Sequence, residues 1–361
     1  MKVKCFLALL CFCGLWGCNR RVEKGNLPFT IDDAVSLQGE VIYEKLFWGR
    51  PSRLCVVDSF LYAVDDYDDK LLTVLNLNTG QTRRLIDYGE GPQELMQIRT
   101  ISYNAERHEL GLYDGQVDRE SFYSIAGDSL LFERSESFHR GAFKNYTFYD
   151  VVPLGDGYLG NGCFEHGEQF IWFRGGEKEP LIFGEYPGDK TGIEQNAAFF
   201  MKTQTLLAVN PNQQYFAAAG CYHDQLVFYR REGDRVRKLK EYFSIEARLK
   251  TRYKRTEKGE MAGTSLLPET MLMYEILYPT ESHLYAVYYG KSNEERKEET
   301  QSHCYILKFS WTGECQKSYK LDYLTTRLAV DEANQCIYTI RLQDEDYVLM
   351  KYAMECKCKT M

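Results

Sequence analysis

Carboxylates gather in short loops along this chain, together with tyrosine and histidine, and each loop follows a run of alternating apolar residues. Converging carboxylates could hold a divalent cation such as Ca²⁺, whose preferred ligands are oxygens. None of the loops has the one-three-five spacing of acids found in an EF-hand, so we expect no cofactor, with calcium as the alternative. Side chains of these types on one face would instead suit a polar ligand. The candidate ligand-binding residues are Asp66, Tyr67, Asp68, Asp114, Glu165, His166, Tyr222, His223, Asp224 and Tyr289.

Two of the loops also combine cysteine with histidine, residue types that bind zinc when they converge. Cys163 is followed by His166, and Cys221 is followed by His223. The two pairs lie 58 residues apart and differ in the spacing between cysteine and histidine. We therefore interpret them as repeated structural elements with buried thiols and predict no metal site.

The elements that must position these loops are short strands in a repeated pattern. An alternating apolar phrase that ends in turn residues starts at positions 61, 110, 158, 215, 284 and 337. The gaps between successive starts are 49, 48, 57, 69 and 53 residues, close to the recurrence of roughly 40–50 residues that is typical of a propeller blade. Further strand-like runs separated by turns surround each phrase. The pattern predicts an all-β fold, a six-bladed β-propeller over residues 37–354.

The last predicted blade supplies only three strands, ending near residue 352, whereas the front of the chain has one strand to spare at 40–47. If that segment completes the last blade, the ring closes and no sheet edge in it stays open. Ring closure by residues 40–47 is therefore the expectation on which the count of six blades depends.

A sharp turn is predicted where the first blade passes to the second, at 87–94, because two glycines and a proline occur within four residues. Here the chain resembles the TolB-like, NHL-like six-bladed propeller lipoproteins of Bacteroidota, which often carry a Gly-x-Gly-Pro-x-Glu turn at a blade junction. Gly89, Gly91, Pro92 and Glu94 match that turn. The resemblance covers residues 40–352 as a blade pattern and implies a blade-linking role for the turn.

Two polar insertions interrupt the blades. Residues 244–270 are strongly basic, and helical periodicity within 245–258 predicts a short helix there. Residues 291–302 are almost wholly charged and polar. We interpret both as solvated excursions at the rim, with an anionic partner of the basic segment as the alternative.

The N-terminus reads as a targeting segment. Lys2 and Lys4 precede an apolar stretch too short to span a bilayer as a helix. The stretch ends Leu15-Trp16-Gly17-Cys18, which resembles the lipobox of bacterial lipoproteins, although a small residue is usual at the position of Trp16. We expect a signal peptide over 1–17, lipidation of Cys18, a tether over 18–36 and a C-terminal tail over 355–361. An ordinary secretory signal is the alternative.

The net charge limits which partners the protein can bind, and the cysteine spacing limits which disulfides it can form. Residues 1–17 contain two lysines and no acid, so their removal changes the charge from −8 to −10, with 42 basic residues against 52 acidic ones. Phosphate backbones would repel such a body, so we expect no nucleic-acid partner. Eight cysteines would follow the lipidated one, and their spacing matches no disulfide framework. We predict no specific bridge.

These observations predict a propeller anchored to a membrane of the cell envelope, acting as a binding or scaffold module for a protein, peptide or glycan. Tyr67, Tyr222 and Tyr289 are the expected contact residues. Acids after the lipidated cysteine accompany surface export in the group that the chain resembles; here Asn19-Arg-Arg21 follows, which favours the periplasmic side of the outer membrane.

Two other functions stay open at this point. One is a metal-dependent lyase or hydrolase with a site at the central channel, and the other is a structural subunit of an envelope complex. The chain has no Gly-x-Ser-x-Gly elbow, and its six histidines form no evident nucleophile–base pair. Propeller active sites are nevertheless assembled from distant loops, so motifs alone do not decide between binding and catalysis.

Overall fold

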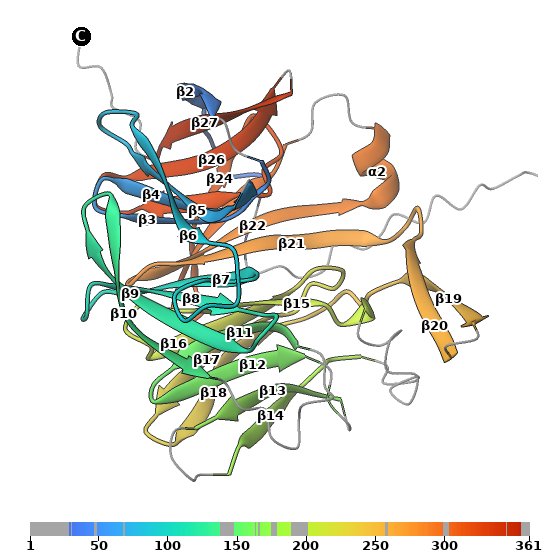
Figure 1. The fold of residues 1–361 in the computed structure, drawn as a ribbon. Helices are drawn as coiled ribbons and strands as arrows, with labels where there is room; N and C mark the ends of the chain where they lie inside the picture. The colour runs from blue at the N-terminus through green and yellow to red at the C-terminus, as the bar shows by residue number, and fades with distance from the viewer. Residues whose placement is uncertain are drawn as a thin grey trace, which may run out of the picture.

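The computed structural model forms a ring of six antiparallel sheets, seen from the side in Figure 1. Most of the described residues lie in strands, in keeping with the Tyr-rich, alternating sequence. The structure describes residues 29, 31–46, 49–67, 69–137, 148–162, 164, 167–174, 179–188, 201–256, 259–298, 303–343 and 345–354.

Blades one to three each contain four strands in chain order. Blade one is β3 (Pro51–Val57), β4 (Phe60–Tyr67), β5 (Lys70–Asn76) and β6 (Thr82–Asp87). Blade two is β7 (Ile98–Asn104), β8 (Glu109–Asp114), β9 (Arg119–Ala126) and β10 (Ser129–Ser137). Blade three is β11 (Phe148–Leu154), β12 (Gly157–Gly162), β13 (Glu168–Phe173) and β14 (Leu181–Glu185).

Blades four to six follow the same plan with additions from the N-terminal segment. Blade four is β15 (Thr205–Val209), β16 (Tyr215–Gly220), β17 (Leu226–Glu232) and β18 (Arg235–Tyr242). Blade five is β21 (Met271–Pro279), β22 (His283–Ser292), β23 (Tyr305–Ser310) and β24 (Cys315–Lys320), joined by β1 (Val35–Ser36). Blade six is β25 (Leu328–Asp331), β26 (Cys336–Gln343), β27 (Asp346–Ala353) and β2 (Glu40–Leu46).

The first strands of the six blades contact one another in a closed cycle. The cycle runs β3, β7, β11, β15, β21, β25 and back to β3. Between the blades, aromatic side chains fill the wedge-shaped gaps; Phe216 and Tyr229 of blade four, for example, stack at 4.9 Å beside Phe170 of blade three. The predicted six-bladed β-propeller is therefore confirmed.

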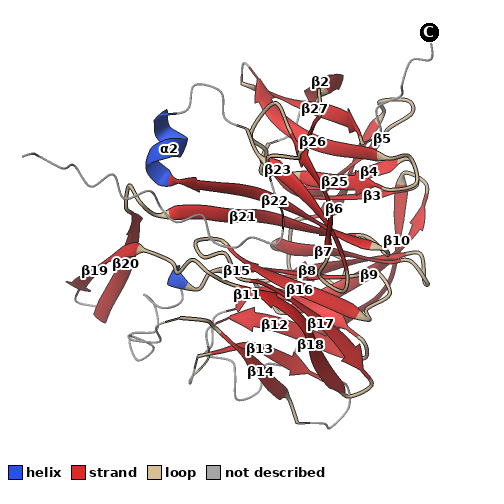
Figure 2. Cartoon of the chain, turned by 180° about the vertical axis from the view of Figure 1, so that it is seen from behind, coloured by secondary structure: helices blue, strands red, loops and turns tan. Residues whose placement is uncertain are grey.

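Ring closure occurs at the predicted segment. β2 pairs antiparallel with β27, with Val41 opposite Met350, and becomes the outer strand of blade six. Just before β2, the chain crosses the buried ring of Tyr352 so closely that a Cβ on Gly39 would lie 2.6 Å from that ring. The first and last parts of the chain thus share one sheet, as Figure 2 shows for β2 and β27.

The end of the predicted tether belongs to the folded body, which corrects the expected boundary at residue 37. Val35 and Ser36 pair in parallel with β24, and Leu37 donates its backbone N–H to the carbonyl of Lys320 at 2.9 Å. Further upstream, the ring of Phe29 packs edge-on against Tyr288 at 5.2 Å. A two-residue parallel pairing has too little periodicity to be visible in the sequence.

The basic insertion is a β-hairpin, so the helix expected within 245–258 is wrong. β19 (Leu249–Thr256) pairs antiparallel with β20 (Gly259–Leu266), and both figures show the hairpin standing apart from the ring. The sequence of β19 alternates between basic and other residues, which is the period of a strand and outweighs the helical pattern.

The second insertion contains a short helix, α2 (Asn293–Glu298), with a capping box at its start. The backbone N–H of Glu295 donates to Ser292 Oγ at 3.1 Å, and the N–H of Ser292 donates to Glu295 Oε2 at 2.7 Å. Across the described residues, the structure contains no helix of the length and apolar character needed to cross a membrane.

The turn with two glycines and a proline links blade one to blade two, as predicted. Glu94 folds back on the turn and accepts the N–H of Gly91 at 2.9 Å. Gly89, at φ 159°, passes so close that a Cβ would lie 2.1 Å from that carboxylate. Arg119 of blade two donates to the carbonyls of Gly91 and Glu94. These contacts give the turn a structural role.

Candidate functional site

A cavity of about 860 Å³ occupies the central channel, and the first strands of all six blades line it. Its mouth is formed by the turns that connect the first and second strands of the blades, a side of the ring that we call the first-turn face. The mouth residues Asp58, Glu281 and Asn334 are exposed. The predicted ligand-binding loops join second to third strands, which places them on the opposite side, the second-turn face.

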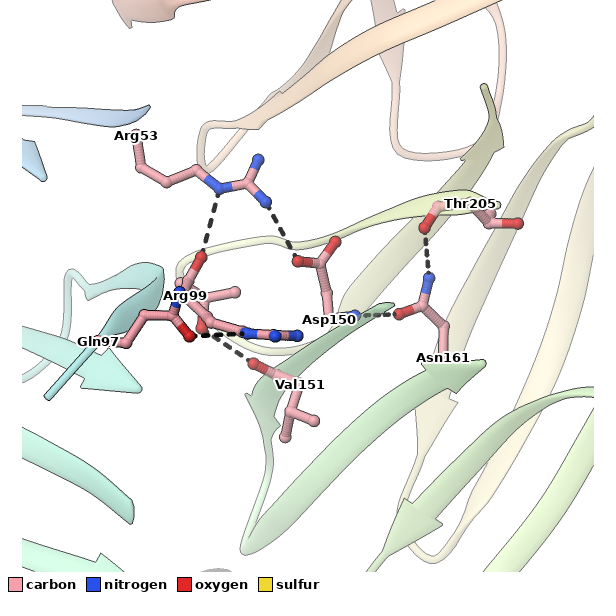
Figure 3. A network of polar contacts seen from close by, with 8 residues as sticks. Arg53, Gln97, Arg99, Asp150, Val151, Asn161 and Thr205 are labelled. Atoms are coloured by element: carbon pink, nitrogen blue, oxygen red, sulfur yellow. Dashed lines mark hydrogen bonds and ion pairs between the residues drawn. The ribbon is translucent and has the colours of Figure 1, made fainter. Parts of the chain in front are cut away.

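A polar network forms the floor of the cavity (Figure 3). Arg53 Nη2 lies 3.2 Å from Asp150 Oδ1, and Arg53 Nε donates to the carbonyl of Arg99 at 3.3 Å. The backbone N–H of Asp150 donates to Asn161 Oδ1 at 2.9 Å, and Asn161 Nδ2 donates to the carbonyl of Thr205 at 2.8 Å. The network therefore joins blades one to four at the depth where the cavity ends.

Opposing effects act on the Asp150 carboxyl. Burial raises its pKa above the usual range, and the charge of Arg53 partly opposes that rise. Thr100, also on the floor, donates its hydroxyl to the carbonyl of Val151 at 3.0 Å. The groups on the floor are thus engaged with one another, so the floor acts mainly as a rigid end to the channel.

The middle of the cavity is largely apolar. Val56, Ile101, Val152 and Ile276 lie on its wall. Cys55 lies beside them as a thiol, since burial raises its pKa to about 12. A thiol held in the protonated form is a poor nucleophile, so Cys55 contributes apolar surface here.

Acids dominate the charge at the mouth. Asp58, Glu281, Asp331 and Glu332 line it, and Arg53 on the floor is the only lysine or arginine among the described lining residues. Glu332 Oε1 accepts the hydroxyl of Tyr285 at 2.8 Å. Asp331 accepts the backbone N–H of Asn334 at 3.0 Å, which shapes its turn.

Several of the residues predicted to bind ligand hold their own loops together. Asp114 is buried and accepts the N–H groups of Met96 and Gln116 at 2.7 and 2.9 Å. Asp224 is buried and accepts the N–H groups of Ser244 and Ile245 at 2.8 and 2.7 Å. The carboxylate oxygens of Asp114 and Asp224 therefore accept hydrogen bonds from backbone N–H groups and shape the turns.

Three further predicted residues pack into the protein. Tyr289 is buried and donates its hydroxyl to the carbonyl of Thr325 at 3.1 Å, whereas Tyr222 is half-buried against the same apolar cluster. His223 is buried, and burial lowers its pKa to about 4, so it is neutral at pH 7. None of these three, and neither Asp114 nor Asp224, is among the described residues that line the central cavity.

The remaining predicted positions lie outside the described part of the structure. Asp68, Glu165 and His166 fall there entirely, and so do the side chains of Asp66 and Tyr67, whose backbones belong to β4. Cys18 lies outside it as well.

The described cysteines and acids show no metal cluster. Cys163 and His166 of the Cys/His pairs fall outside the described residues, and the described part of the chain has no group of three His, Cys, Asp or Glu side chains placed to hold a metal ion. The described cysteines are free thiols: Cys55, Cys221, Cys304, Cys315 and Cys336.

The sequence prediction did not include the mouth residues, because it placed the ligand at the loops between second and third strands. A signal was available, since Asp58 follows the apolar end of β3 and Asp331 is itself the last residue of the apolar strand β25. An acid at the equivalent turn of two blades indicates a shared face once the blades are aligned.

The fold defines the chain as a six-bladed β-propeller. No protein-family model and no curated protein matches its sequence. Among solved structures, it is similar to a Bacteroides fragilis NCTC 9343 protein described as exported, with a TM-score of 0.52 and 12% identity over 91% of this chain and 97% of that one. It is also similar to a member of the DUF4221 family from Bacteroides vulgatus ATCC 8482, with a TM-score of 0.51 and 10% identity over 88% and 96% of the two chains.

Identities this low establish likeness of fold alone. The assignment to the TolB-like, NHL-like propellers stays a prediction from the sequence. Both similar structures nevertheless come from Bacteroides species, the kind of bacterium that the resemblance implied.

Proposed function

We propose that this propeller is a binding module that receives part of a peptide, protein or glycan in its central cavity, through the first-turn face. The observation that carries the proposal is the cavity itself. Its volume of about 860 Å³ lies within the range of roughly 300–1,000 Å³ typical of ligand sites. An apolar wall with a small number of polar groups at one end is the usual composition of such sites.

The ring favours binding because its frame is rigid before a ligand arrives. Six sheets fix the turns of the mouth, and the floor network fixes the depth. A preformed site loses little conformational entropy when it is occupied, which leaves more of the contact energy as affinity.

The proposal includes attachment to a membrane of the cell envelope through acylated Cys18, with the outer membrane and its periplasmic side favoured. The lipobox-like sequence supports it, and so does the fold shared with a protein described as exported. Phe29, the first described residue, packs on blade five and lies eleven positions after Cys18 in the sequence. Such a segment reaches at most about 40 Å, so the anchor would hold the ring close to the membrane.

Glycan and peptide arrays probed with the purified propeller test the binding role. We expect at least one ligand class to bind, and Ala105→Trp, which fills the mouth from the first turn of blade two, to weaken that binding at least tenfold. Ala126→Trp is the matched control, because Ala126 is exposed at the end of β9 in the same blade and does not line the cavity. Val56→Trp fills the cavity from a different blade. If it weakens binding as well, the effect of Ala105→Trp is not confined to the turn of blade two.

The result that contradicts the proposal is binding that survives both cavity-filling variants while thermal unfolding shows them to be folded. The ligand would then lie elsewhere, and the second-turn face with Tyr67 and Tyr222 would become the first place to look.

Metabolic labelling with a palmitate analogue tests the anchor separately. The wild type is expected to incorporate the label and to fractionate with membranes. Cys18→Ser is expected to lose both properties, whereas Cys13→Ser is the control within the same segment. Label in the Cys18→Ser variant would contradict lipidation at that residue.

A further inference from the structure

We infer that the cavity selects an amphipathic cation, an amine joined to an apolar body, with the apolar part inside and the ammonium group at the mouth. This inference rests on the proposed function and names the chemical class of its ligand. The site is the central channel, and the arrangement of charge around its mouth gives the chemical class of the ligand.

The acids of the mouth occupy one continuous half of the ring. Glu281 comes from blade five, Asp331 and Glu332 from blade six, and Asp58 from blade one, and these blades are neighbours. Blades two to four contribute uncharged groups to the mouth, and these are Tyr103, Ala105, Pro153, Asn210, Pro211 and Gln213. A cation at the mouth would therefore meet acids along one side of the ring and, among the described lining residues, no lysine or arginine on the other. Arg231, which donates to the carbonyl of Gln213 at 3.0 Å, does not line the cavity.

The acids differ in how much of their charge is already engaged. Asp331 and Glu332 accept hydrogen bonds from Asn334 and Tyr285. Asp58 and Glu281 are exposed on their turns, and the imidazole of His108 lies 3.8 Å from the Asp58 carboxylate. Asp58 and Glu281 are thus the acids best able to attract a ligand.

Below the acids, the wall offers an apolar body a place to lie. Val56, Val152 and Ile276 come from three different blades and face the same channel. The charge of the Arg53 guanidinium on the floor is balanced by Asp150, so an anionic ligand would meet little net positive charge there and would have to pass the acids. Water would leave the apolar wall when the alkyl part enters, which stabilises binding in proportion to the apolar area that is buried.

An amine of this kind could come from a lipid-like amine or from a peptide N-terminus with an apolar first residue. Both place a positive nitrogen next to an apolar group. The probes below separate the two sources.

Isothermal titration with three six-carbon probes tests the inference. Hexylamine is expected to bind at least tenfold more tightly than hexanol at pH 7 and low salt, and hexanoate is expected to show no binding. The double variant Asp58→Asn/Glu281→Gln should weaken hexylamine binding about tenfold. Glu314→Gln is the matched control, since Glu314 is exposed on the outer turn of blade five and does not line the cavity; it should leave the affinity unchanged.

Two further probes distinguish a peptide N-terminus from a lipid-like amine. Leucyl-glycinamide and its N-acetyl form differ only in the free amine. Tighter binding of leucyl-glycinamide than of hexylamine favours a peptide N-terminus, and the reverse order favours a lipid-like amine.

The outcomes separate this inference from the proposed function. If hexanol binds as tightly as hexylamine and Ala105→Trp blocks both, the cavity is a ligand site but cation selection is wrong. If hexylamine does not bind, or if it binds equally well to the double variant, the inference is overturned whatever the arrays show. If array ligands bind and survive the cavity-filling variants, the proposed site itself fails.

Discussion

Arg53 of blade one and Asp150 of blade three form an ion pair of 3.2 Å on the floor of the central cavity, 97 residues apart in the sequence. The Asp150 side chain is 9% exposed and that of Arg53 is 37% exposed. A charge as buried as that of Asp150 needs its partner, whereas Arg53 is partly solvated and loses less when the pair is broken. The pair therefore links two blades and sets the depth of the site.

Arg53→Met should destabilise the propeller by about 1–3 kcal/mol at pH 8, because it leaves the Asp150 carboxylate buried without its partner. The loss should be smaller at pH 5, since burial already raises the pKa of Asp150 and a neutral carboxyl is easier to bury. Urea unfolding at both values of pH measures this. Arg53→Met/Asp150→Leu should recover part of the loss at pH 8, and an equal loss at both values of pH would contradict the role given to Asp150.

Gly39→Ala should weaken ring closure. A Cβ at this position would lie 2.6 Å from the buried ring of Tyr352, and such crowding costs about 1–3 kcal/mol. Ser36→Ala, at an exposed position of β1, is the control. Thermal unfolding of the two variants should differ by several degrees, and identical midpoints would show that the segment before β2 does not lie against Tyr352.

His223 should limit stability in acid. Burial lowers its pKa to about 4 from an ordinary value of 6.5. Its contribution is therefore fully present above pH 6.5 and is lost as the pH falls from 6.5 towards 4, by about 3 kcal/mol in total. His223→Phe should remove that part of the pH dependence, whereas His108→Gln, at an exposed histidine, should retain it. Parallel pH profiles for His223→Phe and the wild type would contradict this account.

Glu120 should have the opposite effect on the pH dependence of stability, and should destabilise the fold as the pH rises. It is buried in β9, accepts the hydroxyl of Ser102 at 3.3 Å, and burial raises its pKa to about 8 from 4.5. The folded state favours the neutral acid, so its contribution is present below pH 4.5 and is lost as the pH rises towards 8. Glu120→Gln should be more stable than the wild type at pH 8 and close to it at pH 4.5. Equal stability of the two proteins across this range would exclude a neutral Glu120.

The fold could be predicted because its signals are local and repeated. Alternation over about five residues marks each strand. The last blade was one strand short, and residues 40–47 were expected to supply that strand; β2 does so. The short parallel strand β1 and the β19–β20 hairpin were missed for physical reasons. The first is fixed by backbone bonds to β24, and the second has a sequence compatible with two periods.

The site could be predicted less well, because a propeller cavity is assembled from single residues of many blades. Asp58 and Glu281 lie 223 residues apart, and nothing in either local sequence indicates that they share a mouth. Acids such as Asp114 and Asp224 look equally suited to a ligand in the sequence, yet their oxygens are taken by backbone N–H groups. Only the folded chain distinguishes an acid that shapes a turn from one that faces a cavity.

The central claim is that ligand enters the channel from the first-turn face. A crystal structure of the propeller with the strongest array ligand tests it most directly. The account predicts ligand density between Asp58, Tyr103 and Glu281, above the Arg53–Asp150 pair. Density over the loops of Tyr67 and Tyr222, with an empty channel, would contradict it.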